Sequence, residues 1–310
     1  MPKTPLSFYL HMIAVAVIVF AVGNYVSSRT PDRAEGSPSI ISGDSSTASR
    51  NDNRESAYDR VMRTKTIRCG YIVWDPMVAK DVNTGAMSGV LYDYINELGR
   101  SLDLKVEWAQ ELNFATYVTD INSGKYDIEC TGGWPSAAMG KFVEYTQPIF
   151  YFPVIAFVRL DDTRFDKSLN TINDPSIKVV SIDNDVASRI LKRNFPNAGV
   201  VSMPQMGSEV STQLMMVATG KADLAFVNYS GGLDFIKSNP GKIKPILHTP
   251  AQVIAANISV GANENRLKDM LNAASQELSN SGFVEALLTK YEKYPGSFYR
   301  VAKPYQLTAN

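Results

Sequence analysis

The residues from 126 to 159 constrain the fold of this chain more than any other stretch. A short β-prone run ends there at Gly132 and Gly133, because glycines allow backbone conformations that other residues adopt only at a cost. Pro135 and Ser136 come next, and proline and serine both favour the start of a helix. We therefore predict a strand that breaks at the two glycines and leads into a helix.

The same stretch continues through a helix predicted over 137–142 into a long apolar run, 149–158. This run is shorter than the roughly 20 residues needed to span a bilayer, so it is typical of a buried strand. Ligands of α/β proteins often lie where a strand ends on glycines before a helix, since the amides at the helix start point into the crevice. Trp134, next to the glycines, is therefore a candidate ligand contact.

Strands and helices alternate along the stretch 177–237. The predicted strands are 177–182, 200–203 and 222–227, and the predicted helices are 186–194, 209–219 and 233–237. This βαβα order implies a parallel sheet with helices on both faces, which is an α/β fold class. The chain has 310 residues, 45% of them apolar and 20% charged, which is enough for two lobes.

The charge and the metal-ligating residues exclude several classes of function. Lysine plus arginine and aspartate plus glutamate both number 31, so no net charge draws the chain toward nucleic acid. There are only two histidines and two cysteines, which argues against zinc sites of the usual kind. We expect neither a nucleic-acid partner nor a metal.

The N-terminal residues are typical of an exported protein. Residues 1–26 contain the uninterrupted apolar run 12–22 behind Lys3, which fits a signal peptide or a signal anchor. With its flanks, 6–26, this segment approaches the length that spans a membrane, which favours an uncleaved anchor, while small residues near its end leave cleavage open. Residues 27–56 are rich in serine, aspartate, asparagine and arginine and are predicted to be a disordered linker.

Two features carry a resemblance to a known family. Asp127 opens the strand before the glycines, and the block Tyr-Thr-Gln-Pro at 145–148 is followed by Phe150 and Tyr151. Over roughly 57–294, the chain resembles the extracytoplasmic solute-binding proteins of the polar amino acid uptake type. These are bacterial solute-binding protein family 3, with the type II periplasmic binding fold.

The resemblance implies a fold and a function. The fold would be two-lobed, with parallel sheets flanked by helices and a two-strand hinge. Residues 57–153 and 254–310 would form the first lobe, and 154–253 the second. The protein would be a periplasmic monomer without a cofactor, tethered to the membrane by its N-terminal segment or secreted if that segment is cleaved. It would close on a small polar molecule and deliver it to an inner-membrane permease or a sensor.

The cysteines have two readings in the resembled fold. Cys69 and Cys130 each lie near the end of a predicted strand, and those two strands are neighbours in the first-lobe sheet. An even number of cysteines in an exported protein makes a disulfide an open alternative. Adjacent parallel strands seldom offer the geometry that a disulfide needs, so we expect two buried thiols.

Members of this family hold an amino acid by two charged anchors, and both positions differ here. Counting along the family pattern from Asp127, the arginine that holds the α-carboxylate falls on Met139. The aspartate that holds the ammonium falls on Asn228. The start of the helix at 186, open to an anion in the family, follows Asn184 and the two carboxylates Asp183 and Asp185. A carboxylate desolvated beside a methionine lacks a partner, so we expect a neutral or cationic solute rather than a standard α-amino acid.

The resemblance and the residues nearby give a set of candidate contacts. The predicted ligand-binding residues are Trp74, Asp75, Asp93, Thr131, Gly132, Trp134, Ser136, Met139, Asp183, Asn184, Asp185 and Asn228. In the family an aromatic ring often covers the ligand at the position of Trp74, although Trp74 could equally pack over the lobe edge. Asp93 matches a helix aspartate of the family, with a structural capping role as the alternative.

Two other functions stay open. The fold could serve an accessory protein that contacts another protein and holds no tight ligand. It could also serve a periplasmic dehydratase or lyase, with Glu129 or Glu144 as a general acid. The sequence has no serine, histidine and aspartate in a catalytic order and no phosphate-binding loop, and we expect solvent or a neighbouring side chain to satisfy Glu129. We therefore expect a binding protein and not an enzyme.

Overall fold

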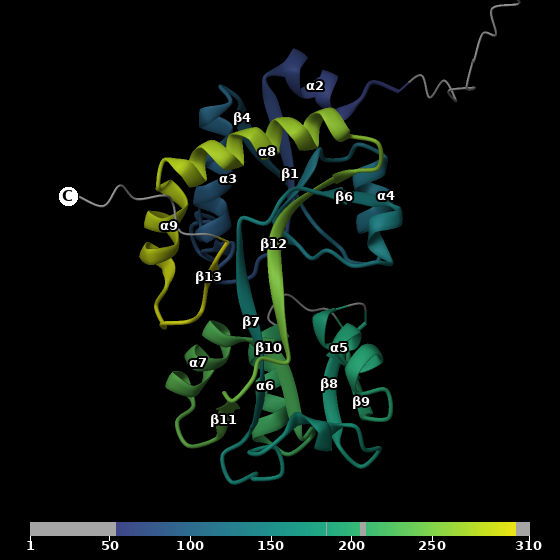
Figure 1. The fold of residues 1–310 in the computed structure, drawn as a ribbon, viewed down its shortest axis with the longest axis vertical. Helices are drawn as coiled ribbons and strands as arrows, with labels where there is room; N and C mark the ends of the chain where they lie inside the picture. Colours follow the sequence, from purple (N-terminus) through teal and green to yellow (C-terminus); the bar gives the residue numbers. More distant parts are fainter. Residues whose placement is uncertain (1–53, 184, 205–208, 302–310) are drawn as a thin grey trace, which may run out of the picture. The chain divides into compact units, whose positions relative to one another are not determined.

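The structure, a computed structural model, describes residues 54–183, 185–204 and 209–301. These residues all belong to one compact unit, Arg54–Asn310. The predicted signal segment, the linker up to residue 53 and Asn184 lie outside the described residues. The described part has two lobes, drawn as the upper and lower halves of Figure 1. The two-lobed α/β fold predicted from the sequence is therefore confirmed.

The first lobe is built on strands β1, β4 and β5, which pair in parallel with β1 in the middle. Its elements are α2 (Ala57–Thr64), β1 (Thr66–Tyr71), β2 (Ala79–Lys80), β3 (Met87–Ser88), α3 (Val90–Ser101), β4 (Lys105–Glu111), α4 (Tyr117–Asn122), β5 (Ile128–Gly133), the 3₁₀ turn Met139–Lys141, β6 (Val143–Tyr145), α8 (Asn265–Asn280) and α9 (Phe283–Tyr291). Helix α3 packs against β4 and β5, and α8 and α9 pack against α3. The apolar stripe of α3 is buried as its helical spacing predicts.

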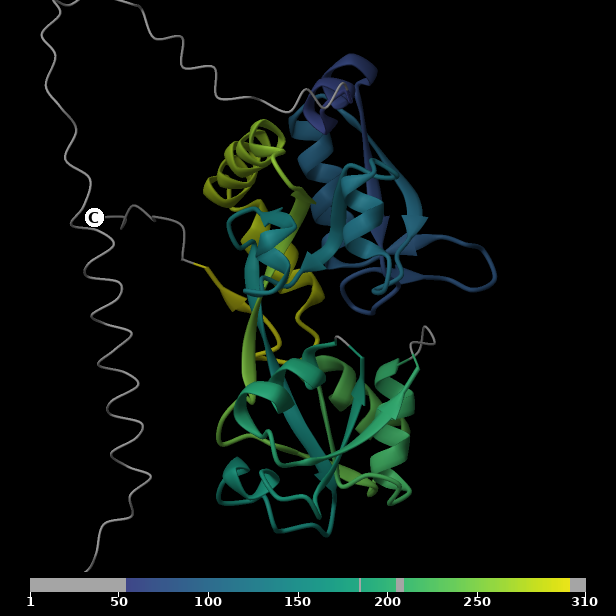
Figure 2. The same ribbon diagram turned by 90° about the vertical axis from the view of Figure 1, so that its right-hand side faces the viewer.

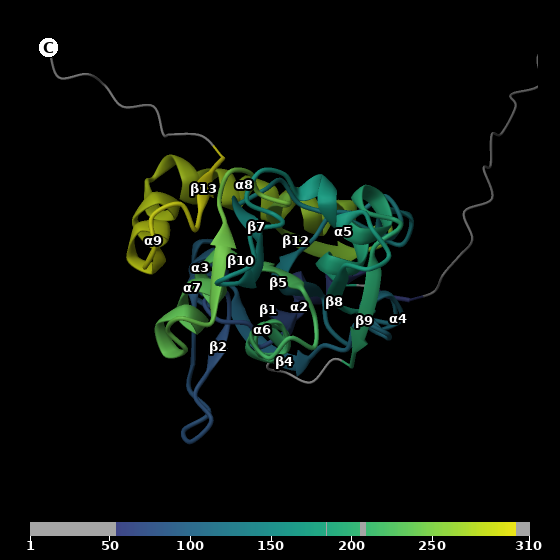
Figure 3. The ribbon, with the colours of Figure 1, turned by 90° about the horizontal axis from the view of Figure 1, so that it is seen from below.

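The second lobe has parallel strands β8, β9 and β10 between helices, as the βαβα order predicts. Its elements are the 3₁₀ turn Leu169–Ile172, β8 (Lys178–Ile182), α5 (Val186–Asn194), β9 (Gly199–Met203), α6 (Glu209–Ala218), β10 (Leu224–Asn228), α7 (Tyr229–Ser238) and β11 (Ile243–Ile246). Alternate residues of β8 join two cores, Val179 with the buried side of α5 and Val180 with that of α6. Helices α5 and α6 therefore cover opposite faces of the sheet, as Figure 3 shows.

Two long strands pass through both lobes. They are β7 (Phe150–Arg159) and β12 (Gln252–Gly261), and Figures 1 and 2 show them joining the two halves. They pair antiparallel with one another from Phe150 to Val154, and then each pairs within a lobe, β12 with β5 and β7 with β10. Both sheets are therefore mixed rather than purely parallel. The lobe boundaries predicted near 153 and 253 fall inside these two strands.

The helix predicted over 137–142 is only a single 3₁₀ turn, Met139–Lys141. Ser136 does cap it, because its Oγ accepts a hydrogen bond from the Met139 N–H at 3.2 Å. The turn cannot lengthen because β6 begins at Val143 and pairs with β12, with Tyr145 opposite Ser259. Pairing within the sheet therefore overrides the local helix signal.

Cys69 and Cys130 form a disulfide, so the expectation of two buried thiols is wrong. In the β1–β5 register Cys69 lies opposite Ile128, which places Cys130 two residues further along on the same face. The two Cα atoms are 5.7 Å apart, a separation that a disulfide spans. Whether these two cysteines can form a disulfide depends on the register between β1 and β5, which the sequence does not reveal.

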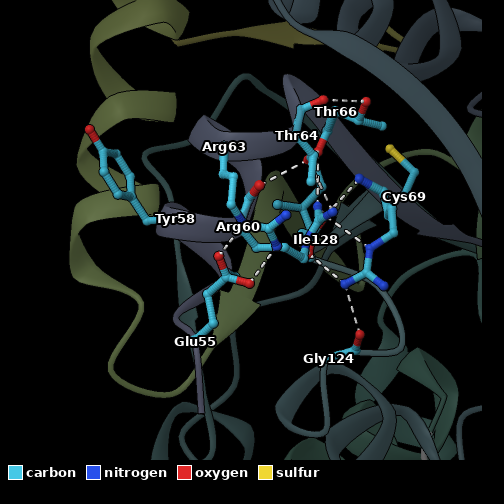
Figure 4. A network of polar contacts seen from close by, with 12 residues as sticks. Glu55, Tyr58, Arg60, Arg63, Thr64, Thr66, Cys69, Gly124 and Ile128 are labelled. Atoms are coloured by element: carbon cyan, nitrogen blue, oxygen red, sulfur yellow. Dashed lines mark hydrogen bonds and ion pairs between the residues drawn. The ribbon is translucent and has the colours of Figure 1, made fainter. Parts of the chain in front are cut away.

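A buried carboxylate, Asp127, ties α2 to the first-lobe sheet. Figure 4 shows the polar contacts around Arg60 and Gly124 from close by. Asp127 is 1% exposed and accepts hydrogen bonds from Arg60 Nε at 2.8 Å and from the Arg68 backbone N–H at 2.8 Å. It also forms ion pairs with both guanidinium groups, and Arg68 donates to the Gly124 carbonyl at 2.8 Å. Asp127 thus fixes the start of β5.

The last described residues of the chain pack onto one of the two long strands. Phe298 is buried, and β13 (Tyr299–Arg300) pairs with β7. Arg300 forms ion pairs with Glu285 and Glu292. Residues 302–310 lie outside the described residues. The segment up to Arg300 is therefore part of the fold.

Candidate functional site

A cavity of about 490 Å³ lies between the lobes and takes its walls from both of them. The first lobe contributes Trp74 and the end of β5, and the second lobe contributes α5 and the end of β10. Phe152 and Ile254, from the two crossing strands, line it as well. The volume suits a small molecule, and a pocket walled by two lobes is a common binding site.

Aromatic rings form one corner of the cavity. Trp74 contacts Trp134 and Phe152 edge to face, with ring centroids 5.6 and 5.4 Å apart. Phe114 lies against the other side of Trp134, at 6.1 Å. Such edge-to-face clusters hold rings in fixed orientations, so this corner offers a rigid apolar wall.

Trp74 also joins the two lobes. Its Nε1 donates to Asn228 Oδ1 at 3.4 Å, and Asn228 Nδ2 donates to Ser230 Oγ at 2.9 Å. Asn228 ends β10 and is the N-cap residue of α7, where it is 5% exposed. An amide at this position bridges the cleft, whereas the aspartate expected from the family would place a negative charge there.

Glu129 is a buried carboxyl group on the first-lobe side of the cavity. It is 4% exposed, and its Oε1 accepts the Thr131 backbone N–H at 2.7 Å. Within the described part of the chain its Oε2 lacks a hydrogen-bond partner of normal geometry. Burial raises the pKa of Glu129 to about 7, although the Thr131 N–H acts against this. The Gly133 N–H and the hydroxyl groups of Thr131 and Ser259 are further neighbouring donors that act to lower this pKa.

The start of α5 places opposite charges on the second-lobe wall. Asp185 caps the helix by accepting the Ser188 N–H at 2.7 Å, and burial raises the pKa of this carboxyl against the effect of that bond. Arg189 lies one turn further, with its guanidinium 5.3 Å from the ring centre of Trp134 in the other lobe. Burial lowers the pKa of Arg189, and the nearby Asp185 and Tyr145 act in the opposite direction.

Sequence reasoning missed Arg189 as a cavity residue. The family pattern places the ligand-binding arginine in the first lobe, at Met139, so no cation was predicted in the second lobe. A signal was present, since an arginine four residues after an N-cap aspartate lies on the same face of the helix. Glu129 was predicted only as a possible catalytic acid. Its burial could not be predicted, because it depends on how β12 and α4 cover β5.

The structure brings together most of the predicted contacts. Eight of them line the cavity, namely Trp74, Thr131, Gly132, Trp134, Ser136, Met139, Asp185 and Asn228. Thr131 does so while its Oγ accepts the Ile72 N–H at 2.7 Å. Asn184 is outside the described residues, and Asp183 is exposed in the preceding turn.

Asp75 and Asp93 lie outside this cavity. Asp93 accepts bonds from Lys290 Nζ at 2.7 Å and from Tyr291 Oη at 2.8 Å, which joins α3 to α9. This arrangement agrees with the structural alternative for Asp93. Asp75 follows Trp74, and burial together with Asp234 of the second lobe raises the pKa of its carboxyl.

Among the described residues, no group of three or more histidine, cysteine, aspartate or glutamate side chains is arranged to hold a metal ion. No helix of the described segments is both long and apolar enough to cross a membrane. The cavity therefore offers rings, amides, hydroxyl groups and a few charged side chains as its chemistry.

Comparisons with known proteins bear on this fold. The model of the bacterial extracellular solute-binding proteins, family 3, matches residues 67–294. An ancestral amino acid-binding protein, a precursor of cyclohexadienyl dehydratase, is 20% identical with a TM-score of 0.66, covering 77% of this chain and all of its own.

Two further structures are similar and contain arginine. An ancestral arginine-binding protein bound to arginine is 21% identical with a TM-score of 0.63, covering 73% of this chain and 98% of its own. An amino acid transporter substrate-binding protein from Streptococcus pneumoniae, bound to L-arginine, is 17% identical with a TM-score of 0.63, covering 80% of this chain and all of its own. At these identities the likeness shows the fold alone. No curated protein matches the sequence.

Proposed function

Because the chain belongs to the bacterial extracellular solute-binding proteins, family 3, we propose that it closes its two lobes on a small polar solute other than a standard α-amino acid. The observation that carries this proposal is the cavity whose walls come from both lobes. A ligand that contacts both walls stabilises the closed arrangement over an open one, since only the closed form supplies all the contacts.

The family sets the wider context. It consists mostly of non-enzymatic binding proteins that deliver small polar ligands to permeases of ABC transporters, and its extracellular character implies a periplasmic location. For this chain we add that it acts as a monomer and that its N-terminal segment tethers it to the membrane. A permease or a sensor then receives the closed form.

The missing anchors support a solute without an α-carboxylate. Met139 occupies the cavity wall at the expected arginine position, and a thioether donates no hydrogen bond. Asp185 caps the start of α5, so a carboxylate already fills that helix end. A carboxylate brought to either place would lose its hydration without a compensating donor, at a cost of several kcal/mol.

Arg189 does not reverse this argument. Its charge is already opposed by the carboxylate of Asp185 on the same helix, and its guanidinium lies over the Trp134 ring. A ligand carboxylate at Arg189 would therefore have to compete with Asp185 for the guanidinium.

The remaining lining suits a neutral or cationic solute. The rings of Trp74, Trp134 and Phe152 offer faces and edges, and Glu129 offers a carboxyl oxygen. Two similar structures hold arginine, whose side chain is a cation. We propose that this chain accepts a comparable cationic or neutral polar group without the amino-acid end.

A thermal-shift screen of the purified full-length chain tests this proposal. Amines, amides, sugars and amino acids are compared at equal concentration, since a ligand that binds only the folded state raises the melting temperature. We expect stabilisation by one class that lacks an α-carboxylate. Stabilisation by standard amino acids alone would contradict the choice of solute, and no stabilisation by any class would favour an accessory role through a protein partner.

A further inference from the structure

Resting on the proposed function, we propose that Glu129 and Ser259 form a buried subsite that receives the protonated amine of the solute. The subsite lies at the first-lobe end of the cavity, where β5 and β12 pair with Glu129 opposite Ser259. The proposed function names only a small polar solute. The subsite specifies which chemical group of that solute is bound and which two side chains bind it.

Two buried oxygen atoms define the subsite. Neither Glu129 Oε2 nor Ser259 Oγ makes a hydrogen bond of normal geometry in the described part of the chain, although the Ser259 hydroxyl is near enough to lower the pKa of Glu129 and of Tyr117. Glu129 is 4% exposed and Ser259 is 0% exposed. A buried acceptor without a donor costs about 1–3 kcal/mol, so a donor group of a solute in the cavity would stabilise Glu129 Oε2.

A glycine of β5 lies next to these two oxygens. Gly133 lies between the two side chains, where a Cβ would stand 2.0 Å from Ser259 Oγ and 2.7 Å from Glu129 Oε2. Only a glycine lets the two oxygens approach the backbone here. Glu129 and Gly133 both line the cavity, so Glu129 lies at the cavity wall and not in a separate void, and Ser259 is its neighbour on β12.

The phenol groups closest to Glu129 are uncharged near neutral pH. Phenol groups face Glu129 from three elements: Tyr117 from α4, Tyr126 from the residues before β5 and Tyr145 from β6. Burial first and the Glu129 charge second raise the pKa of each tyrosine, that of Tyr145 to about 12, so all three are neutral near pH 7. Further out, Asp120 acts on Tyr126, and Arg189 acts on Tyr145.

These surroundings make the subsite selective. The neighbours that stabilise the ionised Glu129 are hydrogen-bond donors, led by the Thr131 N–H, and not cations. A solute ammonium would supply the opposite charge, donate to both oxygens and have an aromatic wall beside it. A hydroxyl group of the same size could donate only one hydrogen bond, without a charge.

Binding of a cation then depends on pH. The ammonium requires an ionised Glu129, whose pKa lies near 7 in the free protein. Below that pH each binding event releases a proton, so affinity falls by up to tenfold per pH unit. The tyrosines stay protonated across this range and do not contribute.

The test compares matched amines and alcohols. Benzylammonium with benzyl alcohol, and n-butylammonium with n-butanol, are titrated into the full-length chain at pH 8 and at pH 6. We expect the amine of each pair to bind at least tenfold more tightly at pH 8, and this preference to shrink at pH 6. Glu129→Gln should abolish both the preference and its pH dependence, and Ser259→Ala should reduce the preference.

Glu144→Gln is the matched control, since Glu144 lies in the same lobe, is paired with Lys268 and does not line the cavity. It should behave as the wild type. Equal affinity for amine and alcohol, or an amine preference that survives Glu129→Gln, would overturn the subsite while solute binding stands. If no solute of the wider screen stabilises the chain, the proposed function fails together with the subsite.

Discussion

At the scale of single residues, Glu129 is a carboxyl group whose environment differs strongly from that of a free amino acid. It lies on a strand between two others, and its ionised form is separated from bulk water. Its pKa of about 7, against an ordinary 4.5, means that the folded chain prefers the protonated form. The fold is therefore less stable when this carboxyl is ionised.

The sign of this effect can be measured. Between pH 4.5 and about 7 the folded state holds a proton that the unfolded state has released, so stability falls as the pH rises through this window. The full effect is about 3 kcal/mol. Glu129→Gln should remove it, so the gain in unfolding free energy of the variant over the wild type should grow from pH 4.5 to pH 8.

Urea denaturation of both proteins across this range provides the measurement. A constant difference between variant and wild type at all pH values would show that Glu129 does not titrate inside the folded protein.

At the scale of elements, the sequence patterns predict long amphipathic segments well. Helix α5 begins and ends at its predicted residues, and the strands β7 and β8 do so within one residue of theirs, because each buries one stripe or both faces. The helix after Ser136 and the start of the helix expected over 233–237 were predicted less well. In the second case α7 begins at Tyr229 and Gly232 allows close packing on the Phe157 ring, a tertiary contact.

The candidate site shows the same division. Trp74, Trp134 and Asn228 could be predicted because they follow strand ends or match family positions. Arg189 and the buried state of Glu129 could not, since they depend on which helix face meets the other lobe and on which strand covers β5. The disulfide between Cys69 and Cys130 likewise depends on strand register.

Asp127 offers a test of how one element is held. It joins α2 to the sheet through Arg60 and Arg68 while being 1% exposed, so Asp127→Asn leaves two guanidinium groups without their charge partner. We expect a loss of about 3 kcal/mol in the free energy of unfolding, measured by urea denaturation. Earlier amide exchange in α2 should accompany it.

The control for Asp127 is Glu97→Gln, which breaks an exposed pair with Arg100 three residues away on α3. Exposed pairs of this kind contribute less than about 1 kcal/mol. Similar losses for the two variants would mean that the buried network does not anchor α2.

At the scale of the whole described unit, a few contacts hold the two lobes together. One is the bond from Trp74 to Asn228 inside the cleft. A second lies beside it, where Asp234 of α7 pairs with Lys293 and accepts a bond from Tyr294 Oη at 2.7 Å. Because Lys293 and Tyr294 follow α9, this cluster joins the second lobe to the closing helices of the first.

The Asp234 cluster should influence closure. Asp234→Ala removes both bonds, so we expect the lobes to separate more often and solute affinity to fall severalfold, since closure then costs more free energy. Spin labels at Arg100→Cys and Lys221→Cys, one in each lobe, report the distance distribution. Asp166→Ala, which breaks a pair with Lys244 within the second lobe, is the control and should leave the distribution unchanged. An unaltered distribution in Asp234→Ala would show that the cluster plays no part in closure.

The choice of solute depends most on Met139, which lines the cavity where the resembled family has its carboxylate-binding arginine. Calorimetric titration of the full-length chain with L-arginine and with agmatine, which is arginine without its α-carboxylate, tests this directly. We predict that agmatine binds at least tenfold more tightly, because Met139 offers no donor and the Arg189 guanidinium of the same cavity is already opposed by Asp185. Tighter binding of L-arginine would contradict the account, since a carboxylate would then be held in a cleft that has no donor at that position.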